Sequence, residues 1–375
     1  MPRRKKEAKR PLTALARELK RHRDEHDLTQ EELAFTLDTD PRNLRRWENG
    51  EVILQDMGQL KWIADRLGIP YERLGITPSI YTPLSPEGIN TTVARVWSLI
   101  DAALIADARA VGENLIREIH PQITVNDSEF VRAVTSAFQA VAFATCLNVR
   151  TEEVQQAIDY FQQMEYFARL LNDDTLVNVA LTYQGDMLRR KGDVLQAIEY
   201  IEAVRDAASE SDKIVRGNAL QLLARAYLQA NRAGDFEDAM KQTEELALAT
   251  KEETYRPVRR YDLTTVYEEY AKSYGRLGKI QPALDYIALA ETVRPPTKIS
   301  ELLVKVTRAD ILIRSGDVRN GEPLAVEAAI YCKKHGHYRH LERLYAIKRY
   351  LNRQSFNYGK AERALGEALE GPIEY

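Results

Sequence analysis

Apolar residues recur three and four positions apart along most of the chain, and no stretch alternates in the way that a β-strand does. Leu12, Leu15 and Leu19, for example, lie on one face of a helix together with Ala16. This spacing is typical of helices that bury one apolar stripe against a core. It predicts an all-α protein in which helix follows helix from about residue 90 to 370.

The segment between Thr29 and Gly50 contains helix start and stop signals at short intervals. Thr29 is a helix N-cap residue, and Glu32 three positions on completes a capping box. Asp40 is a second N-cap residue, followed by Pro41 at the first helical position. Gly50 suits the left-handed residue that ends a helix. These signals predict two short helices joined by a tight turn, the geometry in which the second helix reads the DNA major groove.

The second of these helices carries side chains suited to nucleic acid. Leu44 and Trp47 can face the core, while Arg42, Asn43, Arg45 and Arg46 spread over the other sides. Arginine can donate two hydrogen bonds to guanine, and asparagine can pair with adenine or hold a phosphate. The alternative interpretation is an ordinary solvated face in an all-helical protein.

The flanking residues favour the DNA-reading interpretation. Gln30-Glu31-Glu32-Leu33-Ala34, Trp47-Glu48-Asn49-Gly50, and Leu60, Ala64, Leu67, Gly68 and Ile69 form one pattern. With it, the segment resembles a complete phage-repressor/Cro-type helix-turn-helix domain of the xenobiotic-response-element (XRE) family. Such a domain has five helices in a lambda-repressor-like fold.

The resemblance implies roles for individual residues. Gln30 would bind a DNA phosphate, Arg42 and Arg46 would face base edges, and Asn43 would touch backbone or base. Arg23 and Glu48 occupy positions where the family often has a salt bridge. Pro41 and Asp38 depart from the pattern, which usually has a base-reading polar residue and a turn glycine there. The predicted DNA-binding residues are Thr29, Gln30, Arg42, Asn43, Arg45 and Arg46, together with Arg3, Arg4, Lys5 and Lys6 of the N-terminal arm.

Charge is distributed unevenly, although the whole chain has a net charge of −3. Residues 1–75 carry 16 Lys and Arg against 14 Asp and Glu (net +2), which leaves 37 against 42 (net −5) for the remainder. Six of the basic residues lie within Arg3–Arg10. Such an arm can follow phosphates or enter a minor groove. A disordered solubilising tail is an equally open interpretation.

Small residues recur regularly in the second part of the chain. The intervals are 40, 42, 44, 38 and 40 in the series Ala157, Ala197, Ala239, Ala283, Gly321 and Ala361. The clearest copy contains Ala271, Tyr274 and Gly278, and the copy that opens at Ala224 needs three extra residues before Gly234. Small residues let antiparallel helices approach closely, and glycine turns the corner. These copies resemble tetratricopeptide (TPR) repeats, so six or seven helix pairs should form a right-handed α-solenoid with a concave surface.

The predicted domains are therefore a basic arm (1–11), a DNA-binding domain (12–76), a Pro-rich linker (77–89) and a repeat domain (90–375). In a TPR-type stack the first helix of each pair lines the concave groove. Amides there can bond a peptide backbone, and arginines can hold acidic groups. A plain solvated lining is the alternative. The predicted peptide-binding residues are Asp186, Arg189, Asn218, Gln221, Arg225, Glu268, Lys272 and Arg276.

Other chemistry finds little support in the sequence. No Gly-rich phosphate loop, nucleophile elbow or HExxH motif occurs, so we predict neither an enzyme nor a cofactor. His335, His337 and His340 could bind metal, but a polar loop leading into a helix is the favoured interpretation. Cys146 and Cys332 are expected to be reduced core thiols. No apolar run approaches a membrane span and no signal peptide is recognised, so a cytoplasmic protein without a membrane partner is predicted.

A repressor-type domain followed by TPR-like repeats resembles the RRNPP superfamily of peptide-sensing (quorum-sensing) transcription regulators of Gram-positive bacteria and their phages. That resemblance implies a homodimer on a two-fold, double-stranded DNA operator, with a short peptide that modulates DNA binding. Two alternatives stay open: a regulator whose repeats bind a partner protein, and a TPR scaffold protein.

Overall fold

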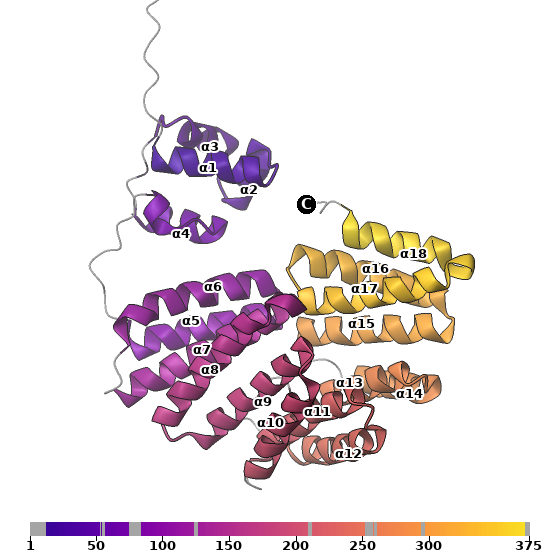
Figure 1. Cartoon of the computed structure of the whole chain (residues 1–375). Coiled ribbons are helices and arrows are strands. Elements are labelled where there is room, and N and C mark those ends of the chain that lie inside the picture. Colours follow the sequence, from indigo (N-terminus) through magenta and orange to yellow (C-terminus); the bar gives the residue numbers. More distant parts are fainter. Residues whose placement is uncertain are drawn as a thin grey trace, which may run out of the picture. The chain divides into compact units, whose positions relative to one another are not determined.

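The computed structural model describes residues 13–52, 54, 57–74, 84–123, 127–208, 212–251, 258, 261–293 and 297–371. The chain divides into two compact units, Met1–Pro83 and Leu84–Tyr375. All regular elements in the described ranges are helices (Figure 1). The predicted all-α class, with a helix-turn-helix followed by helical repeats, is therefore confirmed. The predicted basic arm lies outside the described residues.

The first unit contains four α-helices and one short 3-10 helix in the range that is described. They are α1 (Ala14–Glu25), α2 (Gln30–Thr36), α3 (Pro41–Glu48), α4 (Met57–Leu67) and η1 (Tyr71–Leu74). One apolar core joins them, and Leu19, Leu33, Leu44 and Ile63 are fully buried in it. Each of these residues lies on the apolar stripe of its helix, so the spacing of apolar residues explains the core.

The second unit is an array of antiparallel helix pairs that follow one another in chain order (Figure 1). The pairs are α5 (Pro86–Asp101) with α6 (Ile105–Ile119), α7 (Ser128–Asn148) with α8 (Gln155–Leu170), α9 (Asp174–Lys191) with α10 (Val194–Ala207), α11 (Lys213–Gln229) with α12 (Ala233–Ala249), α13 (Leu263–Arg276) with α14 (Ile280–Thr292), α15 (Lys298–Ser315) with α16 (Val318–Lys334), and α17 (Tyr338–Arg353) with α18 (Ser355–Glu370). Two 3-10 turns, η2 (His120–Gln122) and η3 (Thr151–Glu153), extend the connections.

A left-handed residue turns the chain inside the central pairs. Gly192, Gly278 and Gly316 have φ values of 110°, 74° and 92°, which an L side chain rarely adopts. Asn231 takes the same place between α11 and α12, with φ 60°. Helix α12 begins two residues after Asn231, as α14 begins two residues after Gly278. The predicted insertion of three residues in this copy is therefore wrong, because asparagine replaces the expected turn glycine.

Helix α5 begins earlier than the predicted linker boundary. Ser85 is its N-cap, with Oγ accepting from the backbone N–H of Gly88 at 3.1 Å, and Pro86 occupies the first helical turn. Residues 86–89 therefore belong to the array and not to a linker. Pro86 is compatible with this position, because proline is favoured at a helix start.

Helix α7 is a long apolar helix whose side chains are mostly buried. It is long and apolar enough by composition to cross a membrane, which corrects the expectation that no run approaches that length. In the structure 83% of that apolar window is buried against other helices, as in the core helix of a globular fold. Cys146 of α7 and Cys332 of α16 are buried and in no disulfide, as predicted for core thiols. Burial raises the pKa of Cys332 to about 12.

The two ends of the array contact each other, so the stack of pairs closes into a ring. The backbone N–H of Ala106 donates to the carbonyl of His335 at 3.1 Å. The side-chain amide of Asn148 donates to the carbonyl of Gly336 at 2.7 Å. Gly336 has φ 68°, and a Cβ there would lie 2.7 Å from the Asn148 amide nitrogen. Both the turn and the close approach therefore require glycine at this position.

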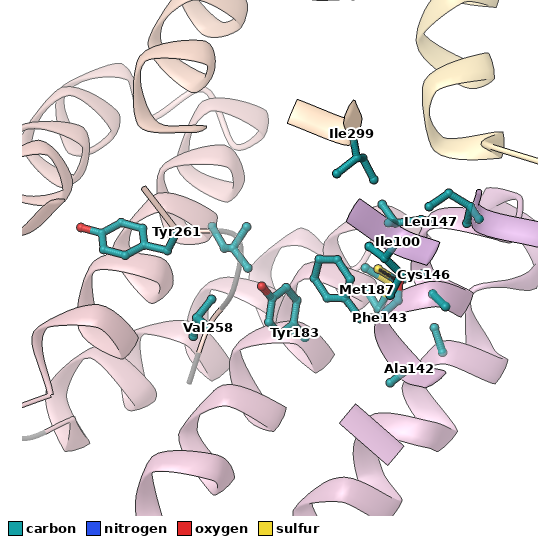
Figure 2. Close-up of a cluster of buried hydrophobic side chains, with 14 of the residues drawn as sticks. Ile100, Ala142, Phe143, Cys146, Leu147, Tyr183, Met187, Val258, Tyr261 and Ile299 are labelled. Atoms are coloured by element: carbon teal, nitrogen blue, oxygen red, sulfur yellow. Dashed lines mark hydrogen bonds between the residues drawn. The ribbon is translucent and has the colours of Figure 1, made fainter. Parts of the chain in front are cut away.

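We call this junction the seam; it comprises Ala102, Ala106, Asn148 and Thr151 on one side and Tyr331, His335, Gly336 and Glu342 on the other. The carboxylate of Glu342 accepts from the backbone N–H and hydroxyl of Thr151, at 2.7 and 2.8 Å. Apolar side chains from both sides of the junction are also buried together. Ile100, Leu147 and Ile299 belong to one buried cluster (Figure 2). The seam thus joins the first two helix pairs to the last two.

Candidate functional site

The start of α2 is fixed by the predicted capping box. The backbone N–H of Thr29 donates to the Glu32 carboxylate at 2.7 Å, and the N–H of Glu32 donates to the Thr29 hydroxyl at 3.2 Å. The hydrogen bond from the Thr29 backbone lowers the pKa of Glu32. Two N–H groups that a helix start leaves unpaired are satisfied in this way.

The turn between α2 and α3 follows the predicted signals. Asp38, at the position where a glycine was expected, adopts the left-handed conformation with φ 42°. Asp40 caps α3 by accepting from the N–H of Arg42 at 2.7 Å, and Pro41 is its first residue. Gly50 follows the helix with φ 67°. Helix α3 is therefore held at both ends by the residues that the sequence indicated.

Glu48 joins the three helices of the motif. Its side chain is 1% exposed, and its carboxylate accepts from Arg23 Nε of α1 at 3.0 Å. The side-chain amide of Gln30, at the start of α2, donates to the other carboxylate oxygen. The expected Arg23–Glu48 salt bridge is present, and the same carboxylate orients Gln30.

The outward side of α3 is formed by cationic and amide side chains. Arg42, Asn43, Arg45 and Arg46 are all exposed, while Leu44 and Trp47 are buried. Arg45 Nε donates to the side-chain carbonyl of Gln30 at 3.3 Å, which ties it to α2. Arg42 and Arg46, four residues apart, lie on the same side of the helix. This surface can present guanidinium groups to base edges and an amide to a phosphate.

The array contains a cavity of about 590 Å³ whose lining comes mainly from the first helices of the pairs. Seven of the eight predicted peptide-binding residues line it, and Asp186 is 1% exposed, beside the lining. The charged residues that line it are Arg189, Arg190, Arg225, Glu268, Glu269, Lys272, Arg276, Arg339, Glu342 and Arg343. The predicted residues are thus brought together, although α17 and the seam also contribute to the site.

Asp186 of α9 forms ion pairs with guanidinium groups of three helices, and it accepts a hydrogen bond from one of them, Arg189. Arg189 Nη2 lies 2.8 Å from its carboxylate, Arg339 Nη2 of α17 lies 3.6 Å away, and Arg225 Nη1 of α11 lies 4.0 Å away. Burial would raise the pKa of Asp186, but the three guanidinium groups outweigh it and hold the pKa well below its usual range. A charged carboxylate therefore joins α9, α11 and α17 across the cavity wall.

A second carboxylate group, Glu268 and Glu269 of α13, continues this network. Glu269 accepts from Arg225 Nε and from Lys272 Nζ, each at 2.6 Å. Burial would raise the pKa of Glu269, but Arg225 and Lys272 outweigh it and lower the pKa. Glu268 accepts from the hydroxyl of Thr307 and from Arg343 Nη1, the latter at 3.3 Å. Opposite charges thus alternate from α9 through α11 and α13 to α17.

Two uncharged amides of α11 behave differently. Gln221 donates to the backbone carbonyl of Thr265 at 2.9 Å, so its amide nitrogen is used to hold α13. Asn218 is 2% exposed and lines the cavity, and its amide nitrogen has no hydrogen-bond partner among the described residues. A buried donor without a partner costs free energy that an acceptor would recover. Asn218 is therefore the better candidate for a ligand contact.

His335 and His337 lie between α16 and α17, and His340 lies in the first turn of α17. His337 and His340 are buried, and their rings stack with centroids 4.2 Å apart. The carbonyl of His335 belongs to the seam. In the described part of the chain, no group of three or more His, Cys, Asp and Glu side chains could hold a metal ion.

A protein-family comparison matches residues 19–74 to the model described as "Helix-turn-helix". Residues 19–74 form a helix-turn-helix domain. Helix α3 is its second motif helix, the one that enters the DNA major groove in this family. The match is to a DNA-binding family and not to an enzyme family. The predicted resemblance to a repressor-type domain is therefore confirmed for this unit.

Other comparisons extend over more of the chain. No curated protein sequence matches it. The solved structure of Bacillus thuringiensis PlcR, in complex with the peptide PapR7 and DNA, covers 74% of this chain and 95% of its own at 15% identity, with a TM-score of 0.37. The apo form of the competence regulator ComR from Streptococcus vestibularis covers 80% of this chain and 98% of its own at 16% identity, with a TM-score of 0.40.

Sequence reasoning missed several residues around the cavity. Glu269 belongs to no sequence motif, yet its carboxylate accepts hydrogen bonds from both Arg225 and Lys272. Arg339 and Arg343 of α17 lie four residues apart and pair with Asp186 and Glu268. Their spacing could have placed them on one helix face, but not opposite α9 and α13. Closure of the ring brings these residues together.

Proposed function

We propose that the protein is a transcriptional regulator whose helix-turn-helix domain binds a double-stranded DNA operator and whose array binds a short linear peptide. DNA binding would take place in the cytoplasm. The observation that carries the peptide proposal is the cavity lined by the first helices of the array, into which Asn218 presents an amide nitrogen without a partner. A peptide backbone supplies carbonyl acceptors at regular intervals, which suits such a donor.

The size of the cavity favours a small ligand over a folded partner. A volume of about 590 Å³ lies within the range of small-ligand sites. A folded protein cannot enter such a space, whereas one segment of extended chain can. A partner protein that inserts a terminal segment is the second candidate, and the peptide experiment below separates the two.

The proposed mechanism is linkage between peptide and DNA. A ligand that contacts α9, α11 and α13 together favours one curvature of the ring. In a homodimer, a change of curvature alters the spacing of two DNA-reading domains, which must match a helical repeat of about 34 Å. Because coupling is reciprocal, a peptide that changes operator affinity must itself bind differently when operator is present.

For the DNA site, we expect Arg42→Ala and Arg46→Ala each to weaken binding to a selected operator by about 1–3 kcal/mol and to relax base preference there. The reason is that both exposed guanidinium groups lie on the outward side of α3. Electrophoretic mobility shifts against the operator and a scrambled duplex would measure it, and sedimentation would report whether two chains bind one operator. Arg308→Ala in α15 removes the same charge as a control. Full affinity and preference in both α3 variants would contradict the assignment.

For the cavity, we expect Asn218→Ala to weaken peptide binding by about 1 kcal/mol or more, because the ligand loses a buried hydrogen bond. Calorimetry with peptides encoded beside the gene would measure this effect in the wild type and the variant. Asn114→Ala on α6, an exposed asparagine, is the matched control. Equal affinity in both variants would place the site elsewhere, and a lack of binding by any such peptide would favour the partner-protein alternative.

A further inference from the structure

Positive charge exceeds negative charge around the cavity. Seven cationic side chains and three carboxylates line it. Asp186, buried beside the lining, adds a fourth carboxylate. Burial lowers the pKa of Lys272 to about 7, so at neutral pH the side chains that surround this space leave between two and three positive charges unbalanced. Opposite charges attract, so a ligand that brings negative charge gains free energy on entering.

The imbalance can be located, because most of the cations are already paired. Arg189, Arg225 and Arg339 contact Asp186, while Lys272 and Arg343 contact the carboxylates of α13. Arg190 donates to the carbonyls of Cys146 and Val149 and lies 3.5 Å from the carboxylate of Glu342.

Arg276, in the last turn of α13, is the exception. Among the described residues it has neither an ion pair nor a side-chain hydrogen bond, and its side chain is exposed toward the cavity that it lines. Burial of its surroundings lowers the pKa of Arg276, and the guanidinium groups of Arg343 and Arg189 add to that effect, whereas Glu269 and Asp310 oppose it. Helices α9, α13 and α17 thus each place one guanidinium group in this region. Arg189 and Arg343 have carboxylate partners there, and Arg276 has none among the described residues.

The same cavity also contains a donor that lacks an acceptor. Asn218 is nine-tenths or more buried, and its amide nitrogen has no partner in the described part of the chain. Its helix, α11, lies between α9 and α13 in the array. A ligand that satisfies the lining must therefore offer both a hydrogen-bond acceptor and a negative group.

We propose that the ligand of this cavity is an acidic peptide, with a carboxylate bound by Arg276 between Arg189 and Arg343 and a backbone carbonyl that accepts from Asn218. This proposal rests on the proposed peptide-binding function and specifies its chemistry. A planar guanidinium can donate two parallel hydrogen bonds to a carboxylate. The carboxylate can belong to an Asp or Glu side chain or to the peptide C-terminus.

The test is affinity selection of short random-sequence peptides on the full-length protein. One library has a free C-terminal carboxylate, and the other is amidated. Enrichment of Asp and Glu in both libraries supports binding of an acidic side chain, and enrichment in the free-acid library alone supports the C-terminus. Selection of neutral or basic peptides overturns the acidic ligand and keeps the peptide function. No selection from either library overturns both.

The role of Arg276 is then tested with the selected peptide. Arg276→Gln should bind it roughly tenfold or more weakly, since a charge-assisted hydrogen bond is lost. The unliganded variant should melt at the same temperature as the wild type or higher, because one repelling charge is removed. Arg308→Gln on α15, an arginine paired with Glu291 outside the lining, should bind normally. Unchanged affinity in Arg276→Gln overturns the assignment.

A measurement on the unaltered protein does not depend on the folding of any variant. Binding of the selected peptide should weaken as salt rises, since ions screen the attraction between opposite charges. A peptide affinity that does not change with ionic strength overturns the proposal.

Discussion

Replacing Asp186 with alanine is expected to lower the free energy of unfolding of the array by about 3–5 kcal/mol. The carboxylate is 1% exposed and is shared by Arg189, Arg225 and Arg339. Its removal leaves the largely buried guanidinium groups of Arg189 and Arg339 without this counterion, whereas Arg225 keeps Glu269. That cost is far larger than the net value of an ion pair in water. Urea denaturation followed by circular dichroism would measure the change.

A matched control separates this effect from a general loss of charge. Asp310→Ala on α15 also removes a carboxylate that accepts from an arginine, Arg314. Both of those side chains are partly exposed, so the loss should be less than about 1 kcal/mol. Equal losses in the two variants would show that the pairing around Asp186 adds no stability of its own.

Acid should unfold the array through the same buried carboxylates. Folding lowers the pKa of Asp186 and of Glu269 from ordinary values of 3.8 and 4.5. The folded state therefore binds fewer protons than the unfolded state in this range, so stability rises with pH. The contribution is fully present above about pH 4.5 and is lost as the pH falls below these ordinary values. Urea titrations at a series of pH values would follow the loss.

The variants Asp186→Asn and Glu269→Gln identify the groups responsible. Each removes one titrating carboxyl, so stability should start lower at neutral pH and depend less steeply on pH in the acid range. Asp310→Asn should keep the steep dependence of the wild type. If neither Asp186→Asn nor Glu269→Gln flattens the profile, other carboxyl groups cause the acid sensitivity.

The sequence specified the local structure well, because its strongest signals act over three or four residues. Thr29 with Glu32, and Asp40 with Pro41, are capping pairs whose hydrogen bonds lie within one helical turn. The errors in the predicted structure were local too. Asn231 adopts the left-handed turn of the neighbouring copies, which a search for glycine alone does not detect.

The cavity was predictable only in part. The register of α9, α11 and α13 placed Asn218, Arg225 and Lys272 on a common face, and they line one space. The sequence cannot show that most charged side chains on this face form ion pairs with one another. Arg339 and Asp186, for example, pair across more than a hundred residues of sequence. Such pairs depend on the curvature of the array, which sums many small rotations between repeats.

Closure of the ring also limits how this protein can change in length. In an open array each repeat contacts only its neighbours, so a duplicated or deleted repeat simply lengthens or shortens the stack. Here Asn148 must reach Gly336, and Thr151 must reach Glu342, across the full circle of pairs. One helix pair more or fewer would separate Asn148 from Gly336 and Thr151 from Glu342. The junction and the cavity would then be lost together. We therefore expect this geometry to hold the number of repeats constant, while substitutions and changes in loop length leave the junction in place.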